Sequence, residues 1–255
     1  MGINKEVYKN RFGMEFECST PFDELKGLVH DACIKYYGEN SVLIKKTSYS
    51  SNKNYNKWHL KIDGTTESEL CTPISSFNDI GKIKKVIKEL GQNIKITNND
   101  STHLHLEIGD IDPRLLVIGW LIIEKGIIRC FPKHRRKNNF CEKLGDGKKH
   151  NIGLLFEKAY GIAENHHSIL SLYHYDQRKT IEFRVCEGTN NSETIENWIK
   201  FCYLFLNYCK NMDVIEVLKK DIGNKNIFFA IEELKLTGKI KKWLEGRYEL
   251  FNKED

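Results

Sequence analysis

The sequence predicts an α+β protein with a mostly antiparallel sheet. Segments in which apolar and polar residues alternate, as in strands with one buried face, are mixed with longer segments of helical periodicity. The strand-like segments are not regularly separated by helices, which favours an antiparallel sheet over a doubly wound parallel one. The chain contains neither G-x-G-x-x-G nor G-x-x-x-x-G-K-[S/T], so neither a Rossmann nor a P-loop nucleotide site is indicated.

Six segments are expected to form strands because apolar residues recur at every second position. In chain order they are Phe12–Cys18, Val42–Thr47, Trp58–Asp63, Glu69–Thr72, Thr102–Ile108 and Thr180–Cys186. In the first segment the apolar side chains share one face, which leaves Glu15 and Glu17 together on the other face.

The predicted helices are longer segments in which apolar residues follow a period near 3.6. They are Phe22–Tyr37, Phe77–Leu90, Pro113–Ile128 and Glu193–Lys210, with shorter segments from Asp213 to the end. Pro113 after Asp112 is typical of a helix start, and Gly91 after Leu90 is typical of a helix end.

The length of 255 residues is enough for one large domain or two small ones. We expect a catalytic domain over residues 1–210 and a C-terminal helical extension over residues 211–255 that packs on the same domain. The longest apolar run, Leu115–Ile123, is much shorter than the roughly 20 residues of a membrane span. No membrane contact and no export signal are expected, so the predicted location is the cytoplasm.

Eight cysteines occur, and none of them form a C-x-x-C pair. Their spacing therefore argues against a zinc knuckle or a thioredoxin-type motif. In a reducing cytosol we expect them to be free thiols that pack as small apolar side chains.

The net charge of +5 (40 basic minus 35 acidic residues) is concentrated in the stretch 129–150. This stretch carries eight basic residues against Glu142 and Asp146, which gives 8 − 2 = +6. A solvated loop would explain the charge, and so would a site for a polyanion, either nucleic acid or the phosphates of a nucleotide.

The polar faces of three predicted strands carry residues that suit metal binding. They read Glu-x-Glu at 15–17, His-x-His-x-Glu at 103–107 and Glu-x-Arg at 182–184. A solvated sheet face needs no such residues. Two carboxylates on one strand face repel only weakly in open water, but in a cleft their repulsion needs a cation to offset it. Carboxylate oxygens suit Mg²⁺ or Mn²⁺, and Mn²⁺ also accepts imidazole.

These motifs, taken in order, resemble the putative amidoligase family, within the glutamine synthetase-like carboxylate–amine ligase superfamily. The matching stretches are FGMEFE (12–17), KIDGTTESELCTPI (61–74), STHLHLEI (101–108), FPKHRRKNNFC (131–141), TIEFRVCEGT (180–189) and the helix with ENWIKF. The resemblance covers about residues 12 to 205. It departs from the family pattern at His134 and Phe140, where a small polar residue and tyrosine are more usual.

The resemblance implies a curved antiparallel sheet with helices on its outer face and divalent ions on its concave face. It also implies a reaction in which ATP phosphorylates a carboxylate and an amine then displaces phosphate. The implied metal ligands are Glu15, Glu17, Glu69, His103 and Glu182, with Asp63 or Glu67 beside Glu17 and Glu69. The implied contacts to ATP are His105, Arg184 and Arg136, and the implied catalytic residues are Arg184, Arg135, Arg136 and Asp63.

ATP and Mg²⁺, with Mn²⁺ as a substitute, are therefore the expected cofactors, and the expected partners are a small or peptide carboxylate and an amine. Asp63 and Glu67 are the candidates for the base that deprotonates the amine. A metal-dependent phosphoesterase or nuclease that uses the same residues is the alternative. A non-enzymatic module that binds nucleic acid through the basic stretch is less favoured, because only Phe131 and Phe140 interrupt that stretch as stacking partners. The oligomeric state and the two substrates stay open.

Overall fold

The computed structural model describes residues 6–46, 55–62, 64, 66–145, 152–213, 216 and 226–253. Thr47, at the end of a predicted strand, lies outside these residues, and so does the candidate site residue Asp63.

The predicted α+β class with a mostly antiparallel sheet is confirmed. The described strands are β1 (Phe12–Cys18), β2 (Val42–Ile44), β3 (Trp58–Lys61), β4 (Ser68–Cys71), β5 (Thr102–Glu107), β6 (Leu170–Ser171) and β7 (Thr180–Phe183). The described helices are α1 (Phe22–Tyr37), α2 (Ile80–Leu90), α3 (Pro113–Ile127), α4 (Lys133–Arg136), α5 (Ile152–Ala163), α6 (Tyr175–Arg178), α7 (Ser192–Lys210), α9 (Ile227–Glu233) and α10 (Gly238–Phe251). Short 3₁₀ turns are η1 (Val7–Lys9), η2 (Phe77–Asp79), η3 (Gly91–Asn93) and η4 (Ile128–Cys130).

The chain divides into two compact units. The carboxylate unit comprises Arg11–His105 and Cys186–Ile199. The arginine unit comprises Met1–Asn10, Leu106–Val185 and Lys200–Asp255. Strand β5 and helix α7 contribute residues to both units.

In the carboxylate unit the strands follow the order β2, β3, β4, β1 and β5. β2 and β3 are parallel, whereas β4 is antiparallel to both β3 and β1. The register places Glu69 opposite both Glu17 and Lys61, and it places Cys71 opposite Glu15. Directly opposite residues lie on the same face of a sheet, so this register gathers polar side chains from three strands.

The core of this unit lies on the other face of β1. Phe12, Met14, Phe16 and Cys18 are buried, while Glu15 and the other residues between them are partly exposed. The alternation that predicted the strand therefore also separates the core from the polar face.

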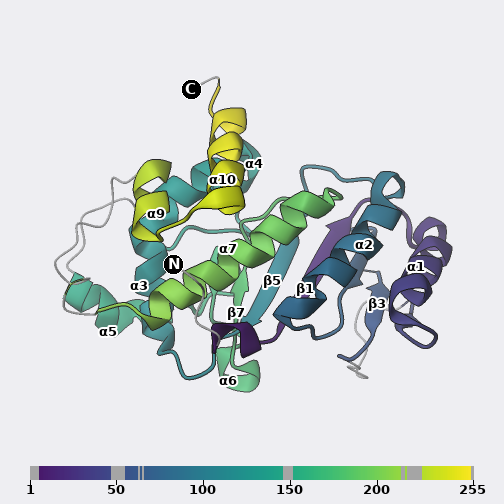
Figure 1. The fold of residues 1–255 in the computed structure, drawn as a ribbon, viewed down its shortest axis with the longest axis horizontal. Coiled ribbons are helices and arrows are strands. Elements are labelled where there is room, and N and C mark those ends of the chain that lie inside the picture. Colours follow the sequence, from purple (N-terminus) through teal and green to yellow (C-terminus); the bar gives the residue numbers. More distant parts are fainter. Residues whose placement is uncertain are drawn as a thin grey trace. The chain divides into compact units, whose positions relative to one another are not determined.

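Helices α1 and α2 pack side by side in this unit (Figure 1), and α1 also contacts β2 and β3. Helix α1 ends at Gly38, whose φ of 86° is in a region that glycine adopts without strain. The predicted helix at 77–90 begins as the turn η2, where Asp79 accepts hydrogen bonds from the backbone N–H and the hydroxyl of Ser76.

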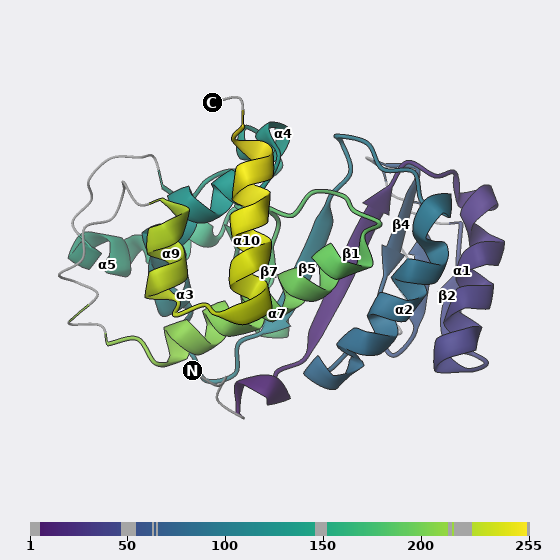
Figure 2. The same cartoon turned by 45° about the horizontal axis from the view of Figure 1, so that its top comes forward.

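In the arginine unit the apolar helix α3 packs against α5 and α9, and α10 packs against η4 and α9. Figure 2 shows α9 and α10 of this unit. Helix α3 begins as predicted, with Pro113 in its first turn and the Asp112 carboxylate accepting from Arg114 N–H. A Cβ atom at Gly126 would lie 2.6 Å from the carbonyl oxygen of Asn226, so glycine allows the start of α9 to contact α3 directly. Strands β6 and β7 form an antiparallel pair that aligns Ser171 with Glu182.

All eight cysteines are free thiols, as predicted, and all except Cys71 are buried. Among the described residues, no helix has both the length and the apolar character that crossing a membrane requires.

Candidate functional site

The polar face of the carboxylate unit gathers five of the predicted site residues. We call the group the carboxylate cluster, and it includes two residues that the sequence did not single out, Lys61 and Cys71. Its members are Glu15 and Glu17 on β1, Lys61 on β3, Glu69 and Cys71 on β4, and His103 and His105 on β5.

Glu15 lies between the two histidines of β5. Its Oε1 is 3.4 Å from His105 Nε2, and its Oε2 is 3.7 Å from His103 Nδ1. Burial would raise the pKa of Glu15, but the two imidazoles outweigh burial and hold the pKa well below its ordinary value of 4.5. Glu15 is therefore an anion over the whole physiological range of pH.

His103 is buried and oriented by a hydroxyl. Ser101 Oγ donates to Glu17 Oε2 and lies 2.7 Å from His103 Nε2. A hydroxyl has one proton, so a Ser101 that donates to Glu17 accepts a hydrogen bond from Nε2–H of the imidazole. With Nε2 bonded to Ser101, Nδ1 is the ring nitrogen on the side of Glu15, 3.7 Å from its Oε2.

Glu69 is buried, with one carboxylate oxygen held by two donors. Its Oε1 lies 2.8 Å from Lys61 Nζ and accepts a hydrogen bond of 2.9 Å from Cys71 Sγ. Burial, followed by the nearby charge of Glu15, raises the pKa of Glu69 to about 7, although Lys61 acts in the opposite direction. Burial would lower the pKa of Lys61, but the charge and the hydrogen bond of Glu69, together with the charges of Cys71 and Glu15, outweigh burial and raise it, so Lys61 stays cationic.

The donor set of the carboxylate cluster fits a divalent cation. Carboxylate oxygens of Glu15 and Glu69 lie within 4.8 Å of each other and of Cys71 Sγ. Burial of Glu69 and the nearby charge of Glu15 both disfavour its ionised form, and a cation bound here would oppose both effects. Carboxylate oxygens suit Mg²⁺ and Mn²⁺, and Mn²⁺ also accepts imidazole. A ligating carboxylate is commonly held by outer partners, as Lys61 holds Glu69.

The arginine unit gathers three more of the predicted site residues, which we call the arginine cluster: Glu182, Arg184 and Arg135. Glu182 lies on β7 and Arg184 just beyond it, and both side chains are buried. The Arg184 guanidinium donates to Glu182 through Nη1 and to the carbonyl oxygen of Phe140 through Nε, at 3.2 Å.

Arg135 is a buried cation that contacts no carboxylate of the described residues. Its side chain is 2% exposed, and Nη2 donates to the carbonyl oxygen of Arg184. Its Nε is buried with no hydrogen-bond partner in the part of the chain that the structure describes. A buried guanidinium that contacts no carboxylate of the described residues is costly, and an anionic ligand would offset that cost.

Arg136, the neighbouring predicted site residue, directs its guanidinium at the end of α10. It donates to the carbonyl oxygens of Phe131, Arg129 and Phe251 at 2.7 to 3.1 Å, and to Asn252 Oδ1 at 3.2 Å. These contacts occupy four of its five N–H groups. The geometry gives Arg136 a structural role that its position in a basic stretch does not reveal.

Replacing Arg136 by alanine should therefore destabilise the protein, by about 1.5 to 3 kcal/mol for the lost hydrogen bonds of a charged donor. Urea denaturation followed by circular dichroism measures the change. The exposed neighbour Lys137 is the control, and Lys137→Ala should leave the midpoint unchanged. Equal midpoints for the two variants would contradict the structural role.

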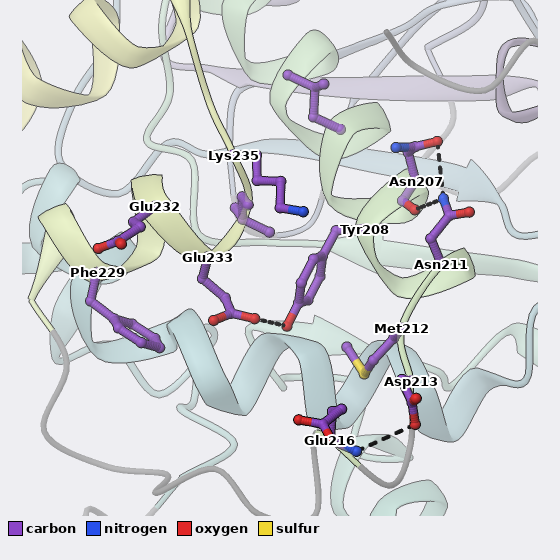
Figure 3. A pocket seen from close by; sticks show the side chains of 12 residues that line it. Asn207, Tyr208, Asn211, Met212, Asp213, Glu216, Phe229, Glu232, Glu233 and Lys235 are labelled. Carbon is purple, nitrogen blue, oxygen red and sulfur yellow. Dashed lines mark hydrogen bonds between the residues drawn. The ribbon is translucent and has the colours of Figure 1, made fainter. Parts of the chain in front are cut away.

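A cavity of about 450 Å³ also lies in the arginine unit, between the C-terminal half of α7, the segment after it and α9 (Figure 3). Tyr208 donates to Glu233 across it at 2.7 Å, and Asn211 donates to the carbonyl oxygen of Asn207 at 2.6 Å. None of its lining residues belongs to either cluster or to the predicted site.

Two candidates of the sequence analysis remain, Asp63 and Glu67. Asp63 lies outside the described residues, and Glu67 is an exposed residue just before β4. Lys61 and Cys71 were missed because an alternating pattern shows which face a side chain takes, but not which residue of the next strand lies opposite.

The family model described as "Putative amidoligase enzyme" matches residues 9–206 of the chain. The match includes β1, β4, β5 and β7, so both clusters lie within it. The chain therefore belongs to this family, and it is an enzyme of the ligase type. No curated protein and no solved structure matches the chain.

Proposed function

We propose that the chain is an ATP- and Mg²⁺-dependent ligase that joins a carboxylate to an amine through an acyl phosphate. Membership of the family supports the reaction class. The observation that carries the metal requirement is the carboxylate cluster, where carboxylate oxygens of Glu15 and Glu69 lie within 4.8 Å of each other and the charge of Glu15 adds to the effect of burial in raising the pKa of Glu69. Mn²⁺ would serve in place of Mg²⁺ because two imidazoles adjoin the carboxylates.

The bound metal would neutralise phosphate charge and polarise a phosphoryl oxygen. Glu15, Glu17, Glu69 and His103 would hold it, with Lys61 and Cys71 fixing one oxygen of Glu69. Because Oε1 of Glu69 accepts from both Lys61 and Cys71, the other oxygen is the one offered to the metal.

The reaction that we propose has two steps. A carboxylate oxygen of the substrate bonds to the γ-phosphorus of ATP, the bond from that phosphorus to the bridging oxygen breaks, and ADP leaves. The amine nitrogen then bonds to the acyl carbon, the bond from that carbon to the phosphate oxygen breaks, and phosphate and a proton leave. Arg135 and Arg184 would stabilise the charge on the transferring phosphoryl group, with Glu182 orienting Arg184.

Hydroxylamine provides the test, because it attacks an acyl phosphate and gives a hydroxamate that is detected by its iron complex. The protein should form hydroxamate, ADP and phosphate from one member of a panel of amino-acid and peptide carboxylates, in the presence of Mg²⁺ and ATP. A protein that neither binds Mg-ATP nor turns it over with any acceptor would contradict the proposal. Metal-dependent cleavage of phosphodiesters without ATP would point to the phosphoesterase or nuclease alternative.

The affinity for Mn²⁺ should increase with pH between about 6 and 8. Glu69 has a pKa of about 7 in the absence of metal, and the metal binds the ionised carboxylate. Below that pKa each ion must displace a proton, so the affinity should fall about tenfold per pH unit. Above it, Glu69 is already ionised and the affinity should level off.

Isothermal titration with Mn²⁺ at pH 6, 7 and 8 measures this dependence. Glu69→Gln is the control, since its amide does not titrate and the steepest part of the dependence should disappear with it. The same affinity at pH 6 and pH 8 in the unmodified protein would contradict the assignment of Glu69 as a ligand.

A further inference from the structure

An exposed group of aromatic rings lies beside the arginine cluster. This aromatic patch consists of Phe140, His166, His167, Tyr173 and His174, and Phe140 and Tyr173 are 55% and 54% exposed. The rings contact one another edge to face, with centroids 5.1 Å apart for Phe140 and His167 and 5.3 Å apart for His167 and His166. Large aromatic rings exposed together, rather than singly, mark a binding surface.

The patch and the arginine cluster share one backbone framework. Phe140 lies in a tight turn, where its N–H donates to Asn138 Oδ1 and its carbonyl oxygen accepts from Arg184 Nε. The chain beyond the turn is tied to the other rings, because Glu142 N–H donates to the carbonyl oxygen of His167 at 2.7 Å. Arg184 N–H in turn donates to the carbonyl oxygen of Ile169 at 2.9 Å.

The backbone of Phe140 is therefore hydrogen-bonded to the buried guanidinium of Arg184, and the buried guanidinium of Arg135 is bonded to the backbone of Arg184 in turn. A ligand that matches both the aromatic rings and these guanidinium groups has a planar base at one end and several negative charges at the other. Stacking on an aromatic ring stabilises the binding of any base, because every base has a π face. A guanidinium group can bind a phosphate through two N–H groups at once.

We propose that the aromatic patch binds the adenine base of ATP, with the base stacked on Phe140 and the phosphates directed to Arg184 and Arg135. The proposal rests on the proposed function, since ATP is the substrate of that reaction. It adds a base-binding site, and it gives a role to His167, whose ring contacts Phe140 edge to face, and to His166, whose ring contacts His167.

Two ligands and three variants separate the base site from the phosphate site. We would measure binding of Mg-ATP and of inorganic Mg-tripolyphosphate, which has the phosphates but no base. Phe140→Ala should weaken the binding of ATP about 5- to 150-fold and leave tripolyphosphate unchanged. Phe140→Trp should retain ATP affinity, and its indole fluorescence should be quenched by ATP but not by tripolyphosphate.

Phe228→Ala is the matched control, because Phe228 is 59% exposed on α9 in the same unit and does not belong to the patch. It should bind both ligands like the unmodified protein. If Phe140→Ala binds ATP as tightly as the unmodified protein does, the base site is wrong while the ligase proposal stands. If the unmodified protein binds neither ligand, the ligase proposal itself fails.

Single-stranded oligonucleotides also combine planar bases with phosphates, so they are a second kind of ligand that the patch and the arginine cluster would fit. If Phe140→Ala weakens the binding of a short oligonucleotide and leaves ATP unaffected, the patch is a nucleic-acid surface and the proposal is overturned. A steep salt dependence of oligonucleotide binding would accompany that result.

Discussion

Glu15→Gln should reduce ATP-dependent hydroxamate formation about a thousandfold while the protein stays folded. Glu15 adjoins both histidines of β5 and lies close to Glu69, so it is the residue that connects the donors of the carboxylate cluster. A metal ion supplies several kcal/mol of charge stabilisation in phosphoryl transfer, and each ~1.4 kcal/mol is tenfold in rate. Initial rates at saturating ATP over a series of Mg²⁺ concentrations measure the loss.

The control is Glu89→Gln, which removes a carboxylate from an exposed ion pair with Lys35 in the same unit. Surface pairs of this kind contribute little, so both rate and stability should be unchanged. If a folded Glu15→Gln protein turned over as fast as the unmodified protein, the carboxylate cluster would have no part in the reaction.

Arg135→Met should reduce turnover about 100- to 1,000-fold, which is the usual cost of losing one donor to developing charge. Its free energy of unfolding should change by less than about 1 kcal/mol, because the lost hydrogen bond to Arg184 is offset by removing a buried charge that contacts no described carboxylate. Rates and urea denaturation of the same preparation measure both effects.

Arg184→Met provides the contrast. It removes the guanidinium that Glu182 contacts inside the protein, and breaking such a buried pair costs about 3 to 5 kcal/mol. If Arg135→Met were instead as unstable as Arg184→Met and fully active, Arg135 would be a structural residue.

Much of the fold could be predicted from the alternation of apolar and polar residues along strands and from capping residues at helix ends. The bounds of β1 were predicted to the residue, and the burial of Phe12, Met14, Phe16 and Cys18 followed from the same pattern. The start of α3 followed from Asp112 and Pro113, because an aspartate cap and a first-turn proline are local signals. Strand β6 is only two residues long and carries no such signal, so the sequence did not predict it.

Alternation also predicted part of the candidate site. Period-two alternation placed Glu15, Glu17, His103 and His105 on polar faces, and the structure brings these four together in one unit. The contact of Lys61 with Glu69 depends on the register of β3 and β4, which no local pattern encodes. In the sequence Arg136 and Arg135 are equivalent members of one basic stretch. In the structure Arg136 donates to the end of α10, whereas Arg135 donates to the backbone of Arg184.

The binding of Mn²⁺ by the carboxylate cluster is the most direct test of the proposed metal site. Titration followed by the electron paramagnetic resonance signal of free Mn²⁺ reports binding without any turnover, and circular dichroism checks that each protein is folded. The unmodified protein should remove Mn²⁺ from solution stoichiometrically, and the double variant Glu15→Gln, Glu69→Gln should not. Equal Mn²⁺ binding by the two folded proteins would show that the ions lie elsewhere.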